Sequence, residues 1–226
     1  MARSSRPRRL RRAFFDRPTV VVARALLGTI LSVGGPGRRR SVRLVETEAY
    51  VARDPANHAY RGRTERNRSM FDRPGTLYVY RIHQVFCANV VTRPGEAVLL
   101  RAGAPLGPKR VGASGPGRLC RRLGIHRGDD GTDVARSPRV ALFAVSGGPP
   151  RIVVGPRVGI RKAVRRRLRF AIAEEPWVSR PALGRRRGPS GASPSRSRGV
   201  GRSNRTRTRR RRPSGGGRSG GRTGGR

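Results

Sequence analysis

The chain has 226 residues, of which 53 are lysine or arginine and 12 are aspartate or glutamate, so its formal net charge is +41. Only Lys109 and Lys162 are lysines, and arginine supplies almost all of the positive charge. A charge of this size excludes a neutral enzyme with an ordinary surface and predicts a polyanionic partner, with nucleic acid as the first candidate. No apolar run approaches the roughly 18 residues that a membrane-spanning helix needs. We therefore expect no membrane partner and a cytoplasmic location.

Two cysteines, Cys87 and Cys120, lie 33 positions apart and form no C-x-x-C pair. This spacing argues against a zinc ribbon and against a redox motif. It indicates instead two unpaired thiols in a reducing compartment.

Composition divides the chain into three parts. Residues 1–12 carry six arginines and no acid, which indicates a basic N-terminal arm. Residues 181–226 carry fifteen arginines and no acid, and Gly, Ser, Pro and Thr make up most of the remainder. We expect a disordered tail there, because such a segment cannot bury a core. The tail either adds non-specific phosphate affinity or has no selected role. One folded domain is expected over 13–180, which holds all the acidic residues.

The body predicts a few short helices among many short strands. A helix should begin near Pro18 and end at Gly28, and a second is expected at 117–123. This pattern favours an α+β fold, a single domain with a curved, largely antiparallel sheet, over alternating βαβ units. The β-rich runs, separated by Gly, Pro, Asp and Asn, predict strands at Thr29–Val33, Val42–Tyr50, Thr76–Tyr80, Val85–Val91, Ala97–Arg101, Val140–Val145, Arg151–Val154 and Leu168–Ile172.

The segment LVETEAY, Leu44–Tyr50, places two of the scarce acids within three positions. On a strand, Glu46, Glu48 and Tyr50 share one face, because successive side chains alternate. One interpretation is a general base beside an aromatic platform. The alternatives are the solvent-facing side of an edge strand, or carboxylates that pair with some of the many arginines.

Three further segments carry candidate functional groups, each with a plain structural alternative. The polar loop at 54–71 contains His58, which is either catalytic or a hydrogen-bonded structural histidine. In PGTLYVY, Tyr78 and Tyr80 share a strand face, where they either stack on a nucleobase or pack in the core. The apolar run AVLLRA contains Arg101, whose guanidinium could meet a phosphate, a carboxylate or water.

The motifs VETEAY, DPANHAYRG, RNRSMF, PGTLYVY, CAN and VLLRAGAP follow one another in this order. GPGRLCRRLGI at 115–125 and a segment from GPRVGI to PWVS at 155–179 come after them. This ordered set resembles the alkylpurine DNA glycosylase family, the alkyladenine-type 3-methyladenine DNA glycosylases. The resemblance covers roughly residues 13–180.

The resemblance implies a base-excision-repair enzyme that flips an alkylated purine out of double-stranded DNA and hydrolyses its N-glycosidic bond. Neither a metal nor a cofactor is expected, and we expect a monomer associated with the bacterial nucleoid. On the premise that no lysine lies near these motifs, we expect a monofunctional hydrolase that leaves an abasic site. By resemblance, the general base is Glu48, the residue that helps hold the attacking water is Arg101, and the base-binding residues are Tyr50, His58, Tyr80 and Asn89.

One motif departs from the family pattern. After YVY the family has a two-residue spacer and then Tyr-Gly, and that tyrosine wedges into the gap left by the flipped nucleotide. Here the text is YVY-RIHQVFC, one residue shorter, with His83 and Gln84 at that place. His83 becomes the candidate intercalating residue, with a smaller ring. A one-residue deletion inverts the facing of a strand unless a loop absorbs it.

Two other functions stay open at this stage. A relative that has weakened or lost turnover would still bind damaged DNA, and the altered wedge at His83 motivates that alternative. A nucleic-acid-packaging or ribosome-associated protein would bind through its arginine-rich ends and show no preference for lesions.

Overall fold

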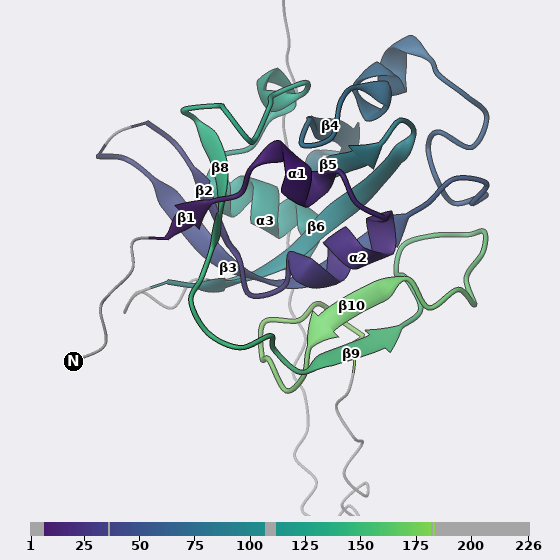
Figure 1. The fold of residues 1–226 in the computed structure, drawn as a ribbon. Helices are drawn as coiled ribbons and strands as arrows, with labels where there is room; N and C mark the ends of the chain where they lie inside the picture. Colours follow the sequence, from purple (N-terminus) through teal and green to yellow (C-terminus); the bar gives the residue numbers. More distant parts are fainter. Residues whose placement is uncertain (1–6, 36, 107–111, 182, 184–226) are drawn as a thin grey trace, which may run out of the picture. The chain divides into compact units, whose positions relative to one another are not determined.

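The computed structural model describes residues 7–35, 37–106, 112–181 and 183, which Figure 1 draws in colour. Residues 1–6 of the predicted arm and nearly all of the predicted tail at 181–226 lie outside the described residues. The predicted domain boundaries therefore stay predictions. In the described part of the chain, no helix is both long and apolar enough to cross a lipid bilayer.

The described residues contain short helices and a larger number of strands. The helices are α1 (Arg12–Phe15), α2 (Thr19–Ala25), α3 (Pro116–Leu123) and the 3₁₀ helices η1 (Glu65–Phe71) and η2 (Arg127–Asp129). The strands are β1 (Arg8–Arg9), β2 (Ile30–Val33), β3 (Arg40–Tyr50), β4 (Leu77–Ile82), β5 (Val85–Arg93), β6 (Glu96–Pro105), β7 (Ala113–Ser114), β8 (Val140–Ala144), β9 (Ile152–Gly155) and β10 (Arg169–Ile172).

The strands form one curled antiparallel sheet with short helices packed on it (Figure 1), which confirms the predicted α+β class. The main path runs β1-β8-β2-β3-β6-β5-β4. Strand β10 pairs with both β3 and β9, and β7 pairs with β6. Each of the eight predicted strands is present, with ends displaced by a few residues. The two-residue strands β1 and β7 were not predicted, because so short a run has no readable alternation.

Strand β3 has partners along both of its edges. Its first half pairs with β2 and its second half with β10, while β6 pairs along the other edge. Thr47 turns toward α2, where its hydroxyl donates a hydrogen bond to the carbonyl of Ala23 at 2.8 Å. Glu46 and Glu48 are both fully buried. The edge-strand alternative for LVETEAY is therefore wrong, and the two carboxylates lie inside the protein.

The hairpin β4–β5 has a two-residue turn, and its strands pair without a break on either side of it, so the shorter text after YVY does not disturb the register. Tyr80 pairs with Cys87 and Tyr78 with Asn89, so only His83 and Gln84 connect the strands. A shift within β5 would have turned Asn89 to the opposite face. His83 takes a φ of +50°, in the left-handed region that favours glycine.

The two longer helices cover the sheet with apolar faces. On α2, Val22, Ala23 and Leu26 are buried while Arg24 is exposed, as a period of 3.6 residues requires. On α3, the buried positions are Leu119, Cys120 and Leu123. Both cysteines of the chain are buried and unpaired, as the sequence predicts.

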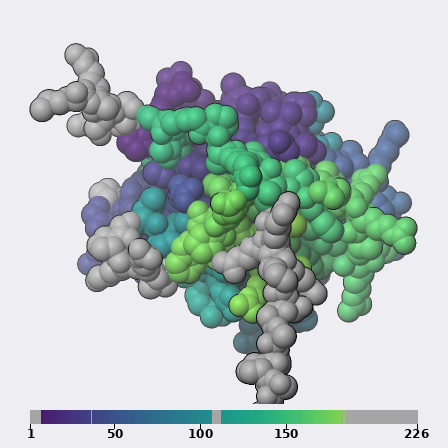
Figure 2. Space-filling model, turned by 90° about the horizontal axis from the view of Figure 1, so that it is seen from below, coloured from purple at the N-terminus to yellow at the C-terminus, as the bar shows by residue number. Residues whose placement is uncertain are grey.

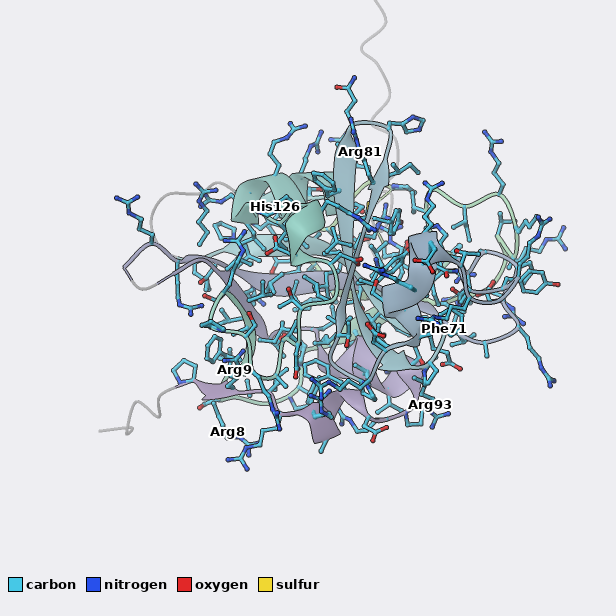
Figure 3. The ribbon with its side chains drawn as sticks, turned by 90° about the horizontal axis from the view of Figure 1, so that it is seen from above. Arg8, Arg9, Phe71, Arg81, Arg93 and His126 are labelled. Atoms are coloured by element: carbon cyan, nitrogen blue, oxygen red, sulfur yellow. The ribbon has the colours of Figure 1, made fainter. Side chains whose placement is uncertain are left out.

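Part of the predicted basic arm belongs to the sheet. Arg8 pairs with Ala144 and Arg9 with Phe143, and Figure 3 labels both arginines. The Arg9 guanidinium donates to the carbonyl oxygens of Val134 at 2.7 Å and of Val140 at 3.2 Å. These contacts hold the start of the described chain against β8.

Candidate active site

A cavity of about 470 Å³ lies beside β3, β4, β5 and β6, and residues 55–58 and 158–162 of two loops also line it. Its size falls within the range of roughly 300–1,000 Å³ that is usual for ligand pockets. The predicted residues that line it are Tyr50, His58, Tyr80, Asn89 and Arg101. Side chains that the sequence did not single out also line it, among them Asn57, Met70, Cys87, Leu99, Val158 and Lys162.

Glu48 lies directly behind the wall of this cavity. Its side chain has no exposed surface, and it is not itself a lining residue. The hydroxyl of Tyr50 donates a hydrogen bond to Glu48 Oε2 at 3.0 Å, and the backbone N–H of Val158 donates to Oε1 at 2.8 Å. Arg101 Nη1 lies 3.5 Å from Oε1. All three contacts of Glu48 are themselves part of the cavity wall.

Burial raises the pKa of Glu48 above its ordinary range. The positive charge of Arg101 opposes this rise, and so do the hydrogen bonds from Val158 and Tyr50. The carboxylate is consequently a stronger base than an exposed glutamate, since a raised pKa means a greater affinity for a proton. That is the property a general base needs at neutral pH.

Glu46 forms a buried ionic network beside Glu48. Its carboxylate accepts hydrogen bonds from the Ser179 backbone N–H at 2.7 Å and from the Ser179 hydroxyl at 2.9 Å. It also accepts from Arg169 Nε and, at 3.1 Å, from Arg101 Nε. Arg101 therefore bridges the two carboxylates of the E-T-E motif. Glu46 and Glu48 therefore do contact an arginine, which the sequence left open as an alternative, and both carboxylates meet that arginine from the same strand face.

Three ring side chains form one wall of the cavity. His58 Nδ1 lies 2.9 Å from the hydroxyl of Tyr78, and the rings of His58 and Tyr80 meet edge to face at 4.5 Å between centroids. The rings of Tyr78 and Tyr80 lie 5.5 Å apart. Burial raises the pKa of Tyr78 to about 12, so its hydroxyl stays protonated. Burial and the nearby Arg66 lower the pKa of His58, so its imidazole is neutral at neutral pH.

Tyr50 is supported from behind by a buried ion pair. The guanidinium carbon of Arg157 lies 4.6 Å from the centroid of the Tyr50 ring. Arg157 Nη2 lies 2.7 Å from Asp54 Oδ2, and Nη1 donates to the carbonyl of Ala49 at 3.0 Å. Neither charged side chain has exposed surface. The sequence could not distinguish Arg157 among so many arginines, although the motif GPRVGI contained it.

Asn89 on β5 lines the cavity. It is buried, and its side-chain amide donates a hydrogen bond to the carbonyl of Tyr78 at 3.1 Å. That bond fixes the amide on the hairpin, and the amide oxygen has no hydrogen-bond partner among the described residues. An amide in this position can accept or donate to the edge of a bound base.

His83 lies at a hairpin tip, and Lys162, to which the sequence assigned no role, lines the cavity. His83 is exposed at the tip of the β4–β5 hairpin and is not a lining residue. Lys162 is exposed in the loop between β9 and β10 and lines the cavity. The premise that no lysine lies near the motifs is therefore wrong, because Lys162 follows GPRVGI by two residues and lines the same cavity. Within the described ranges, no three His, Cys, Asp or Glu side chains come together to hold a metal ion.

Comparisons with known proteins agree with the resemblance. The model of the family described as methylpurine-DNA glycosylase matches residues 13–176. A protein of Anaeromyxobacter dehalogenans strain 2CP-1, named "Putative 3-methyladenine DNA glycosylase", is 46% identical over 187 residues, 78% of this chain and 88% of that protein. A protein of the same name from Rhizobium johnstonii is 40% identical and covers 75% of this chain and 89% of its own. Another, from Methanocella arvoryzae, is 41% identical and covers 77% and 98%. The chain belongs to the methylpurine-DNA glycosylase family.

Proposed function

We propose that this protein is a DNA-repair glycosylase that releases an alkylated purine from DNA by hydrolysis of the N-glycosidic bond. The observation that carries the proposal is the position of Glu48, a buried carboxylate whose three contacts all line one cavity. The names of the similar proteins support the same reaction and the same class of substrate.

The cavity suits a flipped purine. Rotating a base out of the duplex costs a few kcal/mol, and stacking on aromatic side chains returns about 1–3 kcal/mol per base. Tyr50 and Tyr80 offer electron-rich rings to a purine that alkylation has made cationic. His58 is neutral at neutral pH and so does not repel that cation. We assign these three rings and Asn89 to base binding.

Glu48 would activate the water that attacks the sugar. Each carboxylate oxygen can accept two hydrogen bonds, and Oε2 accepts one from Tyr50 among the described residues. The second position on Oε2 can take a proton from water. Arg101 lies between Glu46 and Glu48, where it holds both carboxylates and can orient the water. The negative charge of Glu48 also stabilises the oxocarbenium-like sugar, and the product is an abasic site.

Exposed arginines on the two loops beside the cavity would bind the DNA backbone. They flank lining residues in both loops, so phosphates on either side of a flipped nucleotide can be neutralised together. We propose that the protein acts as a monomer. His83 at the hairpin tip is the candidate wedge. The arginines are Arg53, Arg61 and Arg63 in the first loop, Arg66 and Arg68 on η1 directly after it, and Arg161, Arg165, Arg166 and Arg167 in the second loop.

Base release from methylated duplex DNA under single-turnover conditions tests the proposal. Glu48→Gln should lower the rate by about 100-fold or more, because removal of a general base costs at least that much. Glu65→Gln is the matched control, since the Glu65 side chain is 89% exposed. If Glu48→Gln releases base as fast as the parent, the assigned role of Glu48 is wrong.

A damaged-DNA-binding protein without turnover is the second candidate. The short turn at His83 favours it, since a smaller side chain fills the gap in the duplex less completely. It predicts tight, salt-sensitive binding to alkylated duplex with no base release by the parent protein. The same single-turnover assay separates the two candidates.

A further inference from the structure

We propose that Ser179 is a positioning residue for base release, because its hydroxyl holds the Arg101 guanidinium in place beside Glu48. The inference rests on the proposed function, in which Arg101 orients the attacking water from its position between Glu46 and Glu48. The sequence assigned no role to Ser179, which is the last residue of PWVS.

Ser179 comes to the site from the segment that follows β10. Figure 1 and Figure 2 draw β10 and the residues after it in light green, beside the green of β9, with which β10 pairs. The backbone N–H of Ser179 donates to Glu46 Oε2 at 2.7 Å, and its carbonyl accepts a hydrogen bond from Arg169 Nη2 at 2.7 Å. Neither bond uses the side chain, so the backbone alone determines where the hydroxyl lies.

The hydroxyl of Ser179 lies between the Arg101 guanidinium and the Glu46 carboxylate. It accepts a hydrogen bond from Arg101 Nε at 2.9 Å and donates one to Glu46 Oε1 at 2.9 Å. Arg101 Nε also donates to Glu46 Oε1, at 3.1 Å. All three side chains are buried. A bond lost here therefore leaves a buried polar group without that partner, which is costly.

These contacts at Nε determine the direction of the rest of the Arg101 guanidinium. The group is planar and rigid, so a fixed Nε also fixes its two Nη atoms. Nη1 lies 3.5 Å from Glu48 Oε1, which is longer than the roughly 2.7–2.9 Å of a charge-assisted hydrogen bond. The contact with Glu48 is thus the weaker one, and the position of Arg101 beside the cavity depends on Glu46 and Ser179.

Ser179→Ala removes the hydroxyl and retains both backbone bonds. Glu46 then loses one donor, while Arg169 stays bound to the carbonyl of residue 179. Arg101 is consequently the cation that can move toward Glu46 and away from Glu48. Burial raises the pKa of Glu48, and the charge of Arg101 is the largest of the influences that oppose this rise. Withdrawal of Arg101 should therefore raise the pKa of Glu48 further.

The other groups around Glu48 keep their contacts with it in this variant. Tyr50 and the backbone N–H of Val158 still donate to its carboxylate. Among the described residues, the Ser179 hydroxyl bonds only Arg101 and Glu46. The remaining charged and titratable groups are Glu46 and Tyr50 on β3, Cys87 on β5, Arg169 on β10 and Arg157 in the loop after β9.

The full-length parent is compared with Ser179→Ala, Ser179→Thr and Ser114→Ala. The hydroxyl of Ser114 donates to the carbonyl of Val178 at 3.3 Å. Ser114→Ala therefore removes a hydrogen bond to the same segment without removing a bond to a charged group, which makes it the matched control. The pKa of Glu48 is measured in the free protein by NMR titration of ¹³C-labelled glutamate, and its signal is identified by its loss in Glu48→Gln. Single-turnover base release from methylated duplex DNA is measured across the same pH series.

Ser179→Ala should raise the measured pKa of Glu48 and move the rising limb of base release to higher pH. At neutral pH its release should be about tenfold slower, as expected for the loss of a hydrogen bond to a charged group. Ser179→Thr keeps a hydroxyl and should retain the parent pKa and rate, and so should Ser114→Ala. A role in stability alone would lower the unfolding midpoint of Ser179→Ala without a change in the pKa of Glu48.

The inference is overturned if the pKa of Glu48 is the same in Ser179→Ala and the parent, or if Ser114→Ala shifts it equally. The titration needs no DNA, so it decides the position of Arg101 even for a protein that releases no base. A parent without base release would instead contradict the glycosylase proposal, and the two failures therefore give different results.

Discussion

The hydroxyl of Tyr50 donates a hydrogen bond to Glu48, two residues earlier on the same strand, at 3.0 Å. Burial first, and then the charge of Glu48, raise the pKa of Tyr50, so this hydroxyl remains a donor at any pH of interest. A hydrogen bond to the charged form of a carboxyl favours that form. Burial raises the pKa of Glu48, and the hydrogen bond from Tyr50 opposes that rise.

Tyr50→Phe keeps the ring and removes this donor. We expect the pKa of Glu48 to rise further, so the rising limb of base release against pH should move to higher pH. The rate at high pH should change much less, because the stacking surface is retained. The measurement is single-turnover base release across a pH series for the parent and the variant. A limb that stays in place or moves to lower pH would contradict the assigned role.

Glu48→Gln should stabilise the folded protein at neutral pH while it abolishes base release. The raised pKa means that the folded state binds this proton more tightly than the unfolded state. The stability from this group is fully present below the unfolded pKa and is lost as the pH rises through the folded pKa. Glutamine has no such loss, so the gain should appear at neutral pH and vanish in acid. Urea unfolding at several pH values checks this.

The pair Arg157–Asp54 should be essential for stability. Replacement of Arg157 by methionine removes the buried partner of Asp54 and leaves it the half-exposed Arg166 at 3.8 Å and the Ala56 backbone N–H at 3.0 Å. The loss of one partner from such a buried pair costs about 3–5 kcal/mol. Adding Asp54→Asn to that variant should recover part of the loss. Urea unfolding of the two single variants and the double variant measures the coupling. If the losses of stability in the two single variants are strictly additive in the double variant, the ion pair does not stabilise the cavity wall behind Tyr50.

Gly103→Ala should destabilise the packing of β6 against its neighbours. A Cβ atom there would lie 2.5 Å from Val42 Cγ2 and 3.2 Å from Leu119 Cδ1, closer than packed carbons tolerate. The cost of such overpacking is about 1–3 kcal/mol. Gly148→Ala is the matched control, because nothing lies within 4 Å of its added Cβ. The midpoint temperature of thermal unfolding should be lower for Gly103→Ala than for the parent, and that of Gly148→Ala should stay close to the parent's.

His83→Gly separates a wedge from a turn. Glycine suits the φ of +50° at this position, so the stability should stay within about 1 kcal/mol of the parent. If His83 enters the duplex, the same variant should slow base release several-fold. Thermal unfolding and single-turnover release, measured on one preparation, distinguish the two roles. An unchanged rate would assign His83 to the turn alone.

Local signals in the sequence were sufficient to predict the strands and to identify the site motifs. A β-rich run between turn residues predicted β3, and five of the six residues that the resemblance assigned to the site line the cavity, all except Glu48. The partners that hold those side chains were not predictable. Arg157, Arg169 and Ser179 contact β3 from more than 100 positions away. Arg157 and Ser179 fall in the motifs GPRVGI and PWVS, but a motif does not show which distant side chain its residues contact. Lys162 was missed for the same reason.

The bond between Glu46 and Ser179 joins residues 133 positions apart. During synthesis, the Glu46 carboxylate on β3 therefore lacks this partner until the ribosome has released the chain as far as Ser179. Buried charge without compensation is costly, so the pocket should acquire its native form late, after the rest of the sheet. A nascent chain that is cut before Ser179 would keep most of its strands and still lack a competent site.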